Sequence, residues 1–251
     1  MSDAGAVAIE LARTGPVDVG FRSVATDAQA LDQIESRLGS HGVRTWLTKR
    51  KQADLPGEGP IRAELRMGDP IDIAEIFNHD VVVLASRDVR LRRFLSDLPV
   101  HTRPDVQILT LLHFEDGAPL RERVEDLLRF DTITGSERDF EAWGHGSDLP
   151  TGTHDDTPII RSLHAKMHGA NSRAIVSWAD DGSATLAETL KDIITVAPAD
   201  VLRGDGSGVP WAAFVATLAI GMAHRQPYPE VARLASAAFI HRSRGSHPPG
   251  T

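Results

Sequence analysis

The sequence predicts an α/β fold in which a mostly parallel sheet carries helices on both faces, in a single domain spanning residues 1–251. Short apolar segments alternate with segments of helical periodicity through most of the chain, which is typical of this class. Two segments, 81–85 (VVVLA) and 106–112 (VQILTLL), are almost continuous apolar runs, as expected for strands covered on both faces. Sheets of this kind bind ligands beyond the carboxyl ends of their strands.

The composition narrows the class of partner. With 41% hydrophobic and 25% charged residues, the chain resembles an ordinary soluble globular protein. A net charge of −8 argues against nucleic acid as a main partner. We expect no membrane span and a cytoplasmic location, because there is neither a long apolar run nor a signal segment. The absence of cysteine excludes disulfides and thiolate chemistry, and the abundance of Ala, Arg, Asp and Gly suggests a GC-rich bacterial genome.

The first fifty residues predict two helices and two strands. Segment 4–14 is an Ala-rich helix, and apolar residues alternate with small or polar ones over 17–21, which predicts a strand. Asp27 is placed to cap a second helix, in which apolar residues keep helical spacing to Leu38. A second strand is expected at 43–48.

The middle of the chain predicts further alternation. An irregular segment rich in Pro and Gly is expected to form a hairpin over 61–65. Helices are expected at 71–77, 89–98 and 120–128, followed by a brief strand at 131–133. In the helix at 89–98, the amphipathic pattern places Arg90, Arg92 and Arg93 on the outer face.

The last hundred residues end in a glycine-rich loop and two helices. A helix begins after Pro158, strands follow at 173–178 and 193–196, and Asp180, Asp181 and Gly182 form a turn. The loop at 204–208 then enters an apolar helix expected at 211–224, and a second helix starts near Glu230. A glycine loop at a helix N-terminus predicts an anion site, because free backbone N–H groups and the helix dipole point the same way.

Segment 212–238 carries residues at a characteristic spacing: Phe214, Gly221, Arg233, Leu234, Ala235, Ala237 and Ala238. This pattern resembles the C-terminal part of the ribokinase/PfkB family of carbohydrate kinases, in which Gly-Ala-Gly-Asp-x-Phe precedes two helices. The resemblance implies a ribokinase-like three-layer α/β/α fold. In the ungapped register, the family's catalytic Asp falls on Ala212, and its Gly-Ala-Gly falls on Val209, Pro210 and Trp211.

The resemblance extends weakly to the N-terminal region. The matching residues are Ala8, Leu11, Ala12, Arg13, Gly15, Asp27, Gly42 and Val43. By this resemblance Asp27 is a substrate residue, whereas Ala6 stands where the family has a sugar-holding Asn. The first residue aligns beyond the family's first strand and part of its lid, so we expect the lid to be reduced or absent. Because family dimers often form through lid strands, we expect a different homodimer or a protein partner.

The resemblance also assigns metal and nucleotide residues. Ser136 and Asp139 stand at the Asn and Glu of the family's Asn-x-x-Glu, which positions Mg²⁺ through water. The alternative is that Ser136 caps a helix with Asp139 in its first turn. Ser177 and Gly182 fall in the loop that touches ATP in the family.

Two main functions remain open. Phosphoryl transfer needs a base, charge-stabilising N–H groups and Mg²⁺. In the ungapped register, Ala212 cannot act as a base and Pro210 has no N–H, which predicts a catalytically impaired kinase homologue (a pseudokinase) that binds a nucleotide, a sugar-like molecule or a protein. In that case Trp211 or Pro210 is expected to fill the place of the γ-phosphate.

The alternative is an active ATP-dependent sugar or nucleoside kinase. In that interpretation the loop is shifted by an insertion, Gly206, Ser207 and Gly208 bind phosphate, and Asp205 is the base, with ATP and Mg²⁺ as cofactors. A nucleotide-binding protein of another kind with similar topology is a third possibility, since a fold does not determine a function.

Overall fold

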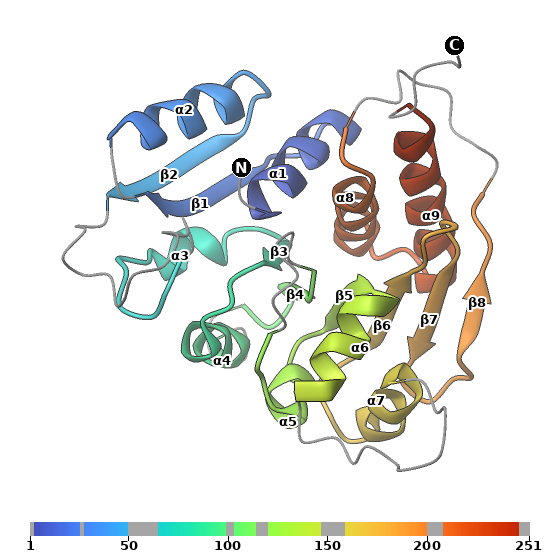
Figure 1. The fold of residues 1–251 in the computed structure, drawn as a ribbon. Coiled ribbons are helices and arrows are strands. Elements are labelled where there is room, and N and C mark those ends of the chain that lie inside the picture. Colours follow the sequence, from blue (N-terminus) through green and yellow to red (C-terminus); the bar gives the residue numbers. More distant parts are fainter. Residues whose placement is uncertain are drawn as a thin grey trace.

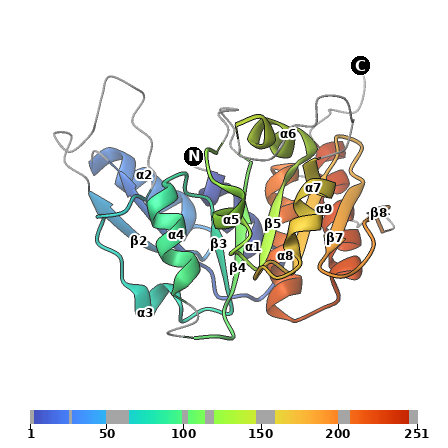
Figure 2. The same ribbon diagram turned by 90° about the horizontal axis from the view of Figure 1, so that it is seen from below.

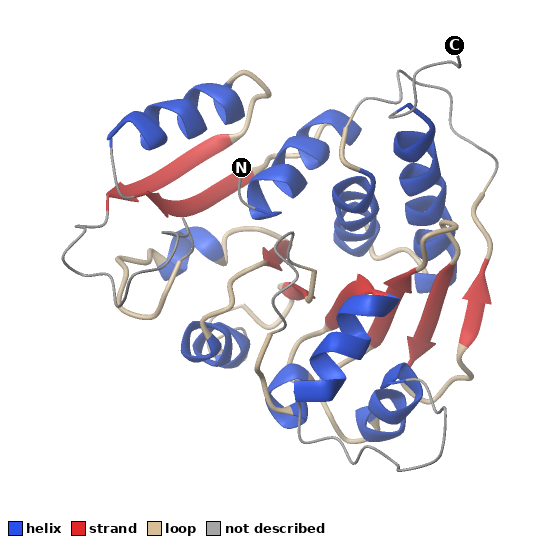
Figure 3. Cartoon of the chain, viewed as in Figure 1, coloured by secondary structure: helices blue, strands red, loops and turns tan. Residues whose placement is uncertain are grey.

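A six-stranded sheet is the centre of the computed structural model, which describes residues 3–25, 28–49, 65–98, 103–113, 120–146, 159–199 and 208–245. The first four strands are parallel, and the last two continue the sheet in antiparallel pairs (Figures 1 and 3). In sheet order the strands are β3 (Val81–Leu84), β4 (Gln107–Leu111), β5 (Thr132–Ser136), β6 (Ala174–Trp178), β7 (Ala184–Glu188) and β8 (Ile194–Val196). The predicted α/β class with a mostly parallel sheet is confirmed.

Helices cover both faces of this sheet and make a three-layer arrangement. One face packs Ile133 and Ile175 against α4 (Val89–Asp97), α5 (Val124–Leu127), α6 (Glu137–Gly146) and α7 (Ile159–Met167). The other face packs Leu109 and Val176 against α1 (Asp3–Thr14), α8 (Pro210–Ala223) and α9 (Tyr228–Gly245). Strands β4 and β6 therefore bury alternate side chains in two different cores, which explains their apolar sequences.

The N-terminal region forms a separate parallel pair. Strands β1 (Gly20–Ala25) and β2 (Arg44–Lys49) pair in register from Gly20–Arg44 to Ala25–Lys49. Their own core includes Phe21, Leu38 and Val43, and it brings α2 (Ala28–Gly39) and α1 against the pair. The short helix α3 (Ile73–Ile76) lies near this pair in Figure 1.

Several predicted boundaries change in the structure. Strand β7 was not expected, although its residues follow the predicted turn at 180–182 and pair with β6 as a hairpin. The helix predicted at 120–128 is a single turn, and the helix predicted at 71–77 is limited to Ile73–Ile76. The predicted cap Asp27 and the hairpin residues 61–64 lie outside the described residues.

The prediction that Arg92 faces outward is wrong. Its side chain is fully buried, and Nη2 donates to Glu122 Oε2 at 2.7 Å while Nη1 donates to the Ser86 carbonyl at 3.1 Å. The guanidinium also lies 5.0 Å from the centre of the Phe130 ring. A charge can be buried only with a hydrogen-bonded partner, and here the partner is 30 residues away in sequence.

The predicted apolar helix near the C-terminus is confirmed as a buried element. Helix α8 lies between α1 and α9, and its residues Phe214, Val215 and Leu218 have no exposed surface. Within the described ranges, no helix is both long and apolar enough to cross a bilayer.

Candidate functional site at the carboxyl edge of the sheet

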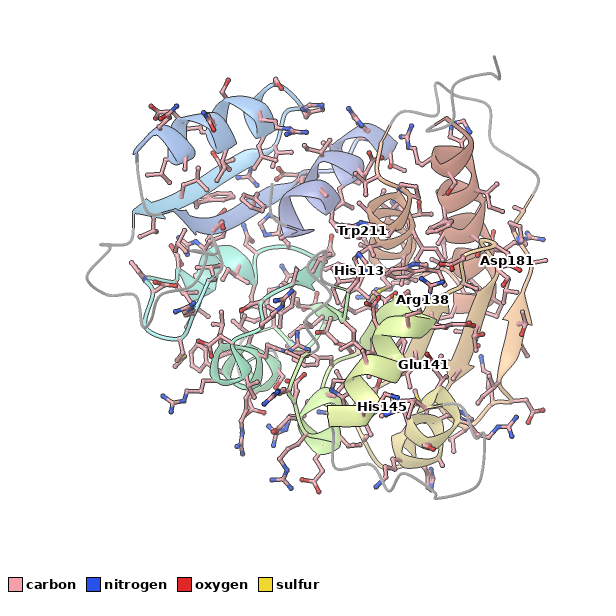
Figure 4. The ribbon with its side chains drawn as sticks, in the orientation of Figure 1. His113, Arg138, Glu141, His145, Asp181 and Trp211 are labelled. Atoms are coloured by element: carbon pink, nitrogen blue, oxygen red, sulfur yellow. The ribbon has the colours of Figure 1, made fainter. Side chains whose placement is uncertain are left out.

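Strands β4, β5 and β6 are parallel, so their carboxyl ends meet at one edge of the sheet. His113 follows β4, Ser136 ends β5, and the turn containing Asp181 follows β6. Trp211, in the first turn of α8, reaches the same edge, because its ring centre is 4.7 Å from that of His113. Figure 2 shows the molecule turned by 90°, and Figure 4 shows Trp211 and His113 together near the start of α6. Ser136 and the turn at 180–182 therefore lie at the same edge of the sheet.

Ser136 and Asp139 form a reciprocal cap at the start of α6. The Ser136 N–H donates to Asp139 Oδ2 at 2.7 Å, and the Asp139 N–H donates to Ser136 Oγ at 3.1 Å. These bonds satisfy N–H groups that the first turn of a helix leaves unpaired. The helix-cap alternative therefore accounts for both residues without a ligand.

A magnesium role for Asp139 stays a prediction. Its Oδ2 is engaged by Ser136 and His113, which leaves Oδ1 without a partner among the described residues. Magnesium needs a nearly octahedral shell of oxygen atoms, so Asp139 could hold the ion only together with water and ligand phosphates. In the described part of the chain, no three His, Asp or Glu side chains are grouped closely enough to bind a metal ion.

His113 joins the cap to an aromatic cluster, and the sequence did not single it out. Its Nδ1 lies 3.0 Å from Asp139 Oδ2, and its ring meets Trp178 edge-on at 5.8 Å and Trp211 at 4.7 Å. Trp178 in turn packs against Phe214 at 5.1 Å. The available signal was a polar residue directly after a buried strand, at the end where ligands bind.

The β6–β7 turn is built around Gly182. Its φ of +83° favours glycine, and a Cβ there would lie 2.3 Å from Ile240 Cγ1 on α9. In this turn the Asp181 carboxylate accepts bonds from the Ser183 hydroxyl and N–H, which lower the pKa of Asp181. Arg138 Nη2 lies 2.6 Å from Asp180 Oδ2 and links the turn to α6. The positive φ and the close approach of Ile240 thus account for Gly182 without a ligand. A contact between Gly182 and ATP remains a prediction.

Ser177 lies inside the sheet. Its side chain is fully buried, it pairs with Gly135 of β5, and its Oγ has no hydrogen-bond partner among the described residues. A role of Ser177 in nucleotide binding stays a prediction.

Gly208 precedes α8 and is held between α1 and α9. It has a φ of +133°, and a Cβ would lie 2.3 Å from Glu10 Oε1 and 3.1 Å from Arg242 Nε. Glu10 is buried and pairs with Arg13 and Arg242, each at 3.1 Å. The end of the glycine loop is therefore anchored tightly. The other predicted loop residues, Asp205, Gly206 and Ser207, and the predicted substrate residue Asp27 lie outside the described residues.

The first turn of α8 follows Val209 and contains Pro210, Trp211 and Ala212, none of which has an ionisable side chain. Val209 occupies the N-cap position without a side-chain cap bond, and Pro210 starts the helix. Ala212 has no exposed surface. Trp211 lies against His113 at the edge, so a bulky indole stands immediately before the buried position 212.

Comparison with solved structures identifies the fold. Adenosine kinase from Sinorhizobium meliloti superposes with a TM-score of 0.66 at 12% identity, covering 94% of this chain and 75% of that chain. Arabidopsis thaliana ribokinase, complexed with ribose and ATP, gives 0.62 at 16% identity over 94% and 78%. Phosphofructokinase-2 from Escherichia coli, in complex with substrates and products, gives 0.60 at 13% identity over 93% and 78%. A scan of protein-family models and a search of curated proteins found no match.

Proposed function

Since the chain has the fold of the ribokinase/PfkB carbohydrate kinases, we propose that it is a catalytically impaired homologue, a pseudokinase, that binds a nucleotide or a sugar-like molecule. The binding site lies at the carboxyl edge of the sheet, where His113, Asp139 and Trp211 meet. The observation that carries the proposal is the first turn of α8, which begins with Pro210 and buries Ala212 fully. In the ungapped register of the resemblance, Trp211 and Ala212 stand at the family's glycine and catalytic Asp.

The chemistry of phosphoryl transfer supports the loss of activity. An alanine cannot take the proton of the acceptor hydroxyl, and loss of a positioned base commonly costs about 10²–10⁴-fold in rate. Pro210 offers no N–H to a developing negative charge. Because position 212 has no exposed surface, an Asp placed there would be buried behind Trp211. A single substitution at position 212 would therefore not restore the turn.

The alternative is an active ATP-dependent sugar or nucleoside kinase that uses ATP and Mg²⁺. One observation favours it: Gly208, with φ of +133°, lies two residues before the start of α8. In this alternative Gly206, Ser207 and Gly208 bind phosphate and Asp205 is the base.

The deciding experiment measures binding and turnover separately. Calorimetry is done with ATP and ADP, each with and without Mg²⁺, and with ribose, fructose 6-phosphate and adenosine, on the wild type, Trp211→Gly and a control, Trp46→Leu in β2. We expect the wild type to bind at least one ligand without transferring phosphate to ribose, fructose 6-phosphate or adenosine. Removal of the indole at 211 should change the affinity at least severalfold, since it opens the start of α8, whereas Trp46→Leu should not.

Two results would contradict the proposal. Magnesium-dependent transfer of the ATP γ-phosphate to ribose, fructose 6-phosphate or adenosine by the wild type would favour the active-kinase alternative. No binding of any of these ligands would remove the ligand-binding function.

We also propose a homodimer or a protein partner and a cytoplasmic location, the latter on sequence composition alone.

A further inference from the structure

His113 is held in one orientation by three different elements. Nδ1 lies 3.0 Å from Asp139 Oδ2 on α6, and Trp178 of β6 and Trp211 of α8 contact the ring. An ionised carboxylate only accepts hydrogen bonds, so the proton of the neutral imidazole resides on Nδ1. Nε2 is then an acceptor.

This acceptor is available to a ligand. Nε2 has no hydrogen-bond partner among the described residues, and the side chain is 21% exposed at the edge of the sheet where ligands bind. The carboxylate behind the ring prevents the imidazole from turning to satisfy Nε2 elsewhere. The arrangement is one of a fixed polar atom beside aromatic walls, which is typical of small-molecule sites.

The surrounding charges favour a neutral ligand group. Asp139 faces His113 from α6, and the nearby turn adds Asp180 and Asp181, whereas β6 and α8 present the uncharged rings of Trp178 and Trp211. Arg138 is already paired with Asp180. A phosphate would require more unpaired positive charge than these described residues supply.

We propose that His113 Nε2 accepts a hydrogen bond from a hydroxyl group of a sugar or nucleoside, with Asp139 as the positioning residue and Trp211 covering the apolar face of the ligand. This inference rests on the ligand-binding function proposed above. It assigns recognition of a hydroxyl to a residue that the resemblance to kinases did not indicate.

Two substitutions separate the roles of the two ring nitrogen atoms. His113→Asn keeps an N–H near the position of Nδ1 and removes the atom at Nε2, whereas His113→Gln keeps a polar atom near Nε2. The control is His168→Asn, an exposed histidine just after α7. Calorimetry is done with ribose, fructose 6-phosphate and adenosine.

For whichever of these compounds the wild type binds, we expect His113→Asn to lower the affinity roughly fivefold to tenfold, since the accepting atom at Nε2 is removed. His113→Gln should retain part of the affinity. Asp139→Asn should weaken binding less than His113→Asn, because the ring is only less well oriented.

The outcomes distinguish the two proposals. If the wild type binds a compound and both His113 variants bind it with unchanged affinity, the role of His113 is refuted and the ligand-binding function stands. If the wild type binds none of the compounds, both proposals fail. Circular dichroism of each variant verifies folding, and His113→Gln provides the test if His113→Asn does not fold.

Discussion

Tyr228 illustrates how one partly buried polar group can report on folding. It is the only tyrosine of the chain, and its hydroxyl lies 2.7 Å from Thr132 Oγ1 at the start of β5. Burial raises the pKa of Tyr228 above its usual value of 10.0, with the nearby charge of Asp131 acting in the same direction. The charged form is disfavoured in the folded state and favoured in the unfolded chain.

This shift predicts the effect of high pH on stability. Because the folded pKa is raised, the contribution of Tyr228 is fully present below about pH 10 and is lost as pH rises above that value. Tyrosinate absorbance, which reports this residue alone, should rise near pH 10 in strong denaturant and at higher pH in the native protein. Native and denatured titrations that coincide would contradict the burial. The control for the absorbance signal is Tyr228→Phe, which should lower the free energy of unfolding by about 1 kcal/mol.

Burial also raises the pKa of a second group, Asp131, with an effect on stability at low pH. The pKa is raised although Asp131 Oδ2 accepts the Ile108 N–H at 2.9 Å and Arg173 lies 3.4 Å away. For a carboxylate with a raised folded pKa, the folded state binds more protons, so its ionisation lowers stability as pH rises through this range. The side chain is retained because it pairs a backbone N–H between two strands.

At the scale of elements, the contact between α8 and α9 depends on a glycine. A Cβ at Gly221 would lie 2.4 Å from both Cγ atoms of Val231, so the two helices touch where the side chain is missing. We expect Gly221→Ala to lower the free energy of unfolding by about 1–3 kcal/mol, because overpacking outweighs the better helix propensity of alanine. Chemical denaturation measures the change.

The control for this substitution is Gly39→Ala at the end of α2, where nothing lies within 4 Å of the added Cβ. It should be nearly neutral. Equal effects of the two substitutions would show that α8 and α9 are not packed as closely as described. An unchanged or raised stability in Gly221→Ala would show the same.

Elements with a strong local signal were predicted well. The apolar character of α8 and the continuous run of β4 reflect their burial, and the apolar run of β3 packs against both cores. Strand β7 (ATLAE) is short and carries little β-branched sequence, and it forms because the turn at Gly182 folds it back onto β6. Pairing with β6 stabilises β7, whose own sequence has little strand propensity.

At the scale of the whole molecule, the edge strand β8 is exposed. Ile194 in this strand is 40% exposed and the nearby Leu190 is 78% exposed, whereas most large apolar side chains of the described core are buried. An uncovered edge with apolar side chains is a surface for pairing with another chain. This is the reason to expect a homodimer along β8.

Sedimentation tests this expectation. The wild type should sediment as a dimer at high concentration, and Ile194→Lys should shift it towards monomer, since a lysine on an edge strand disfavours pairing. Met67→Lys, which changes an exposed apolar residue elsewhere, should leave the dimer intact. A wild-type monomer at every concentration would contradict the homodimer, and a dimer unaffected by Ile194→Lys would place it on another surface.

The sequence by itself determined the α/β class, the order of most elements and the residues available in the first turn of α8. The class and the order of elements follow from local periodicity in the sequence. The chemistry of the turn follows from residue identity, since Pro210 has no N–H and Ala212 has no ionisable group in any fold. The resemblance to carbohydrate kinases also pointed to the fold that the structural comparisons found.

Only the tertiary structure decided which distant side chains meet. The pairs Arg92–Glu122 and His113–Asp139 are 30 and 26 residues apart, and no local pattern specifies either contact. The helical pattern places Arg92 on an outer face, but its side chain is buried against Glu122. The orientation of His113 depends on residues of three elements that converge on one edge of the sheet. The energy of such contacts depends on burial and on the distance between the groups in space. Neither quantity can be read from the spacing of residues along the chain.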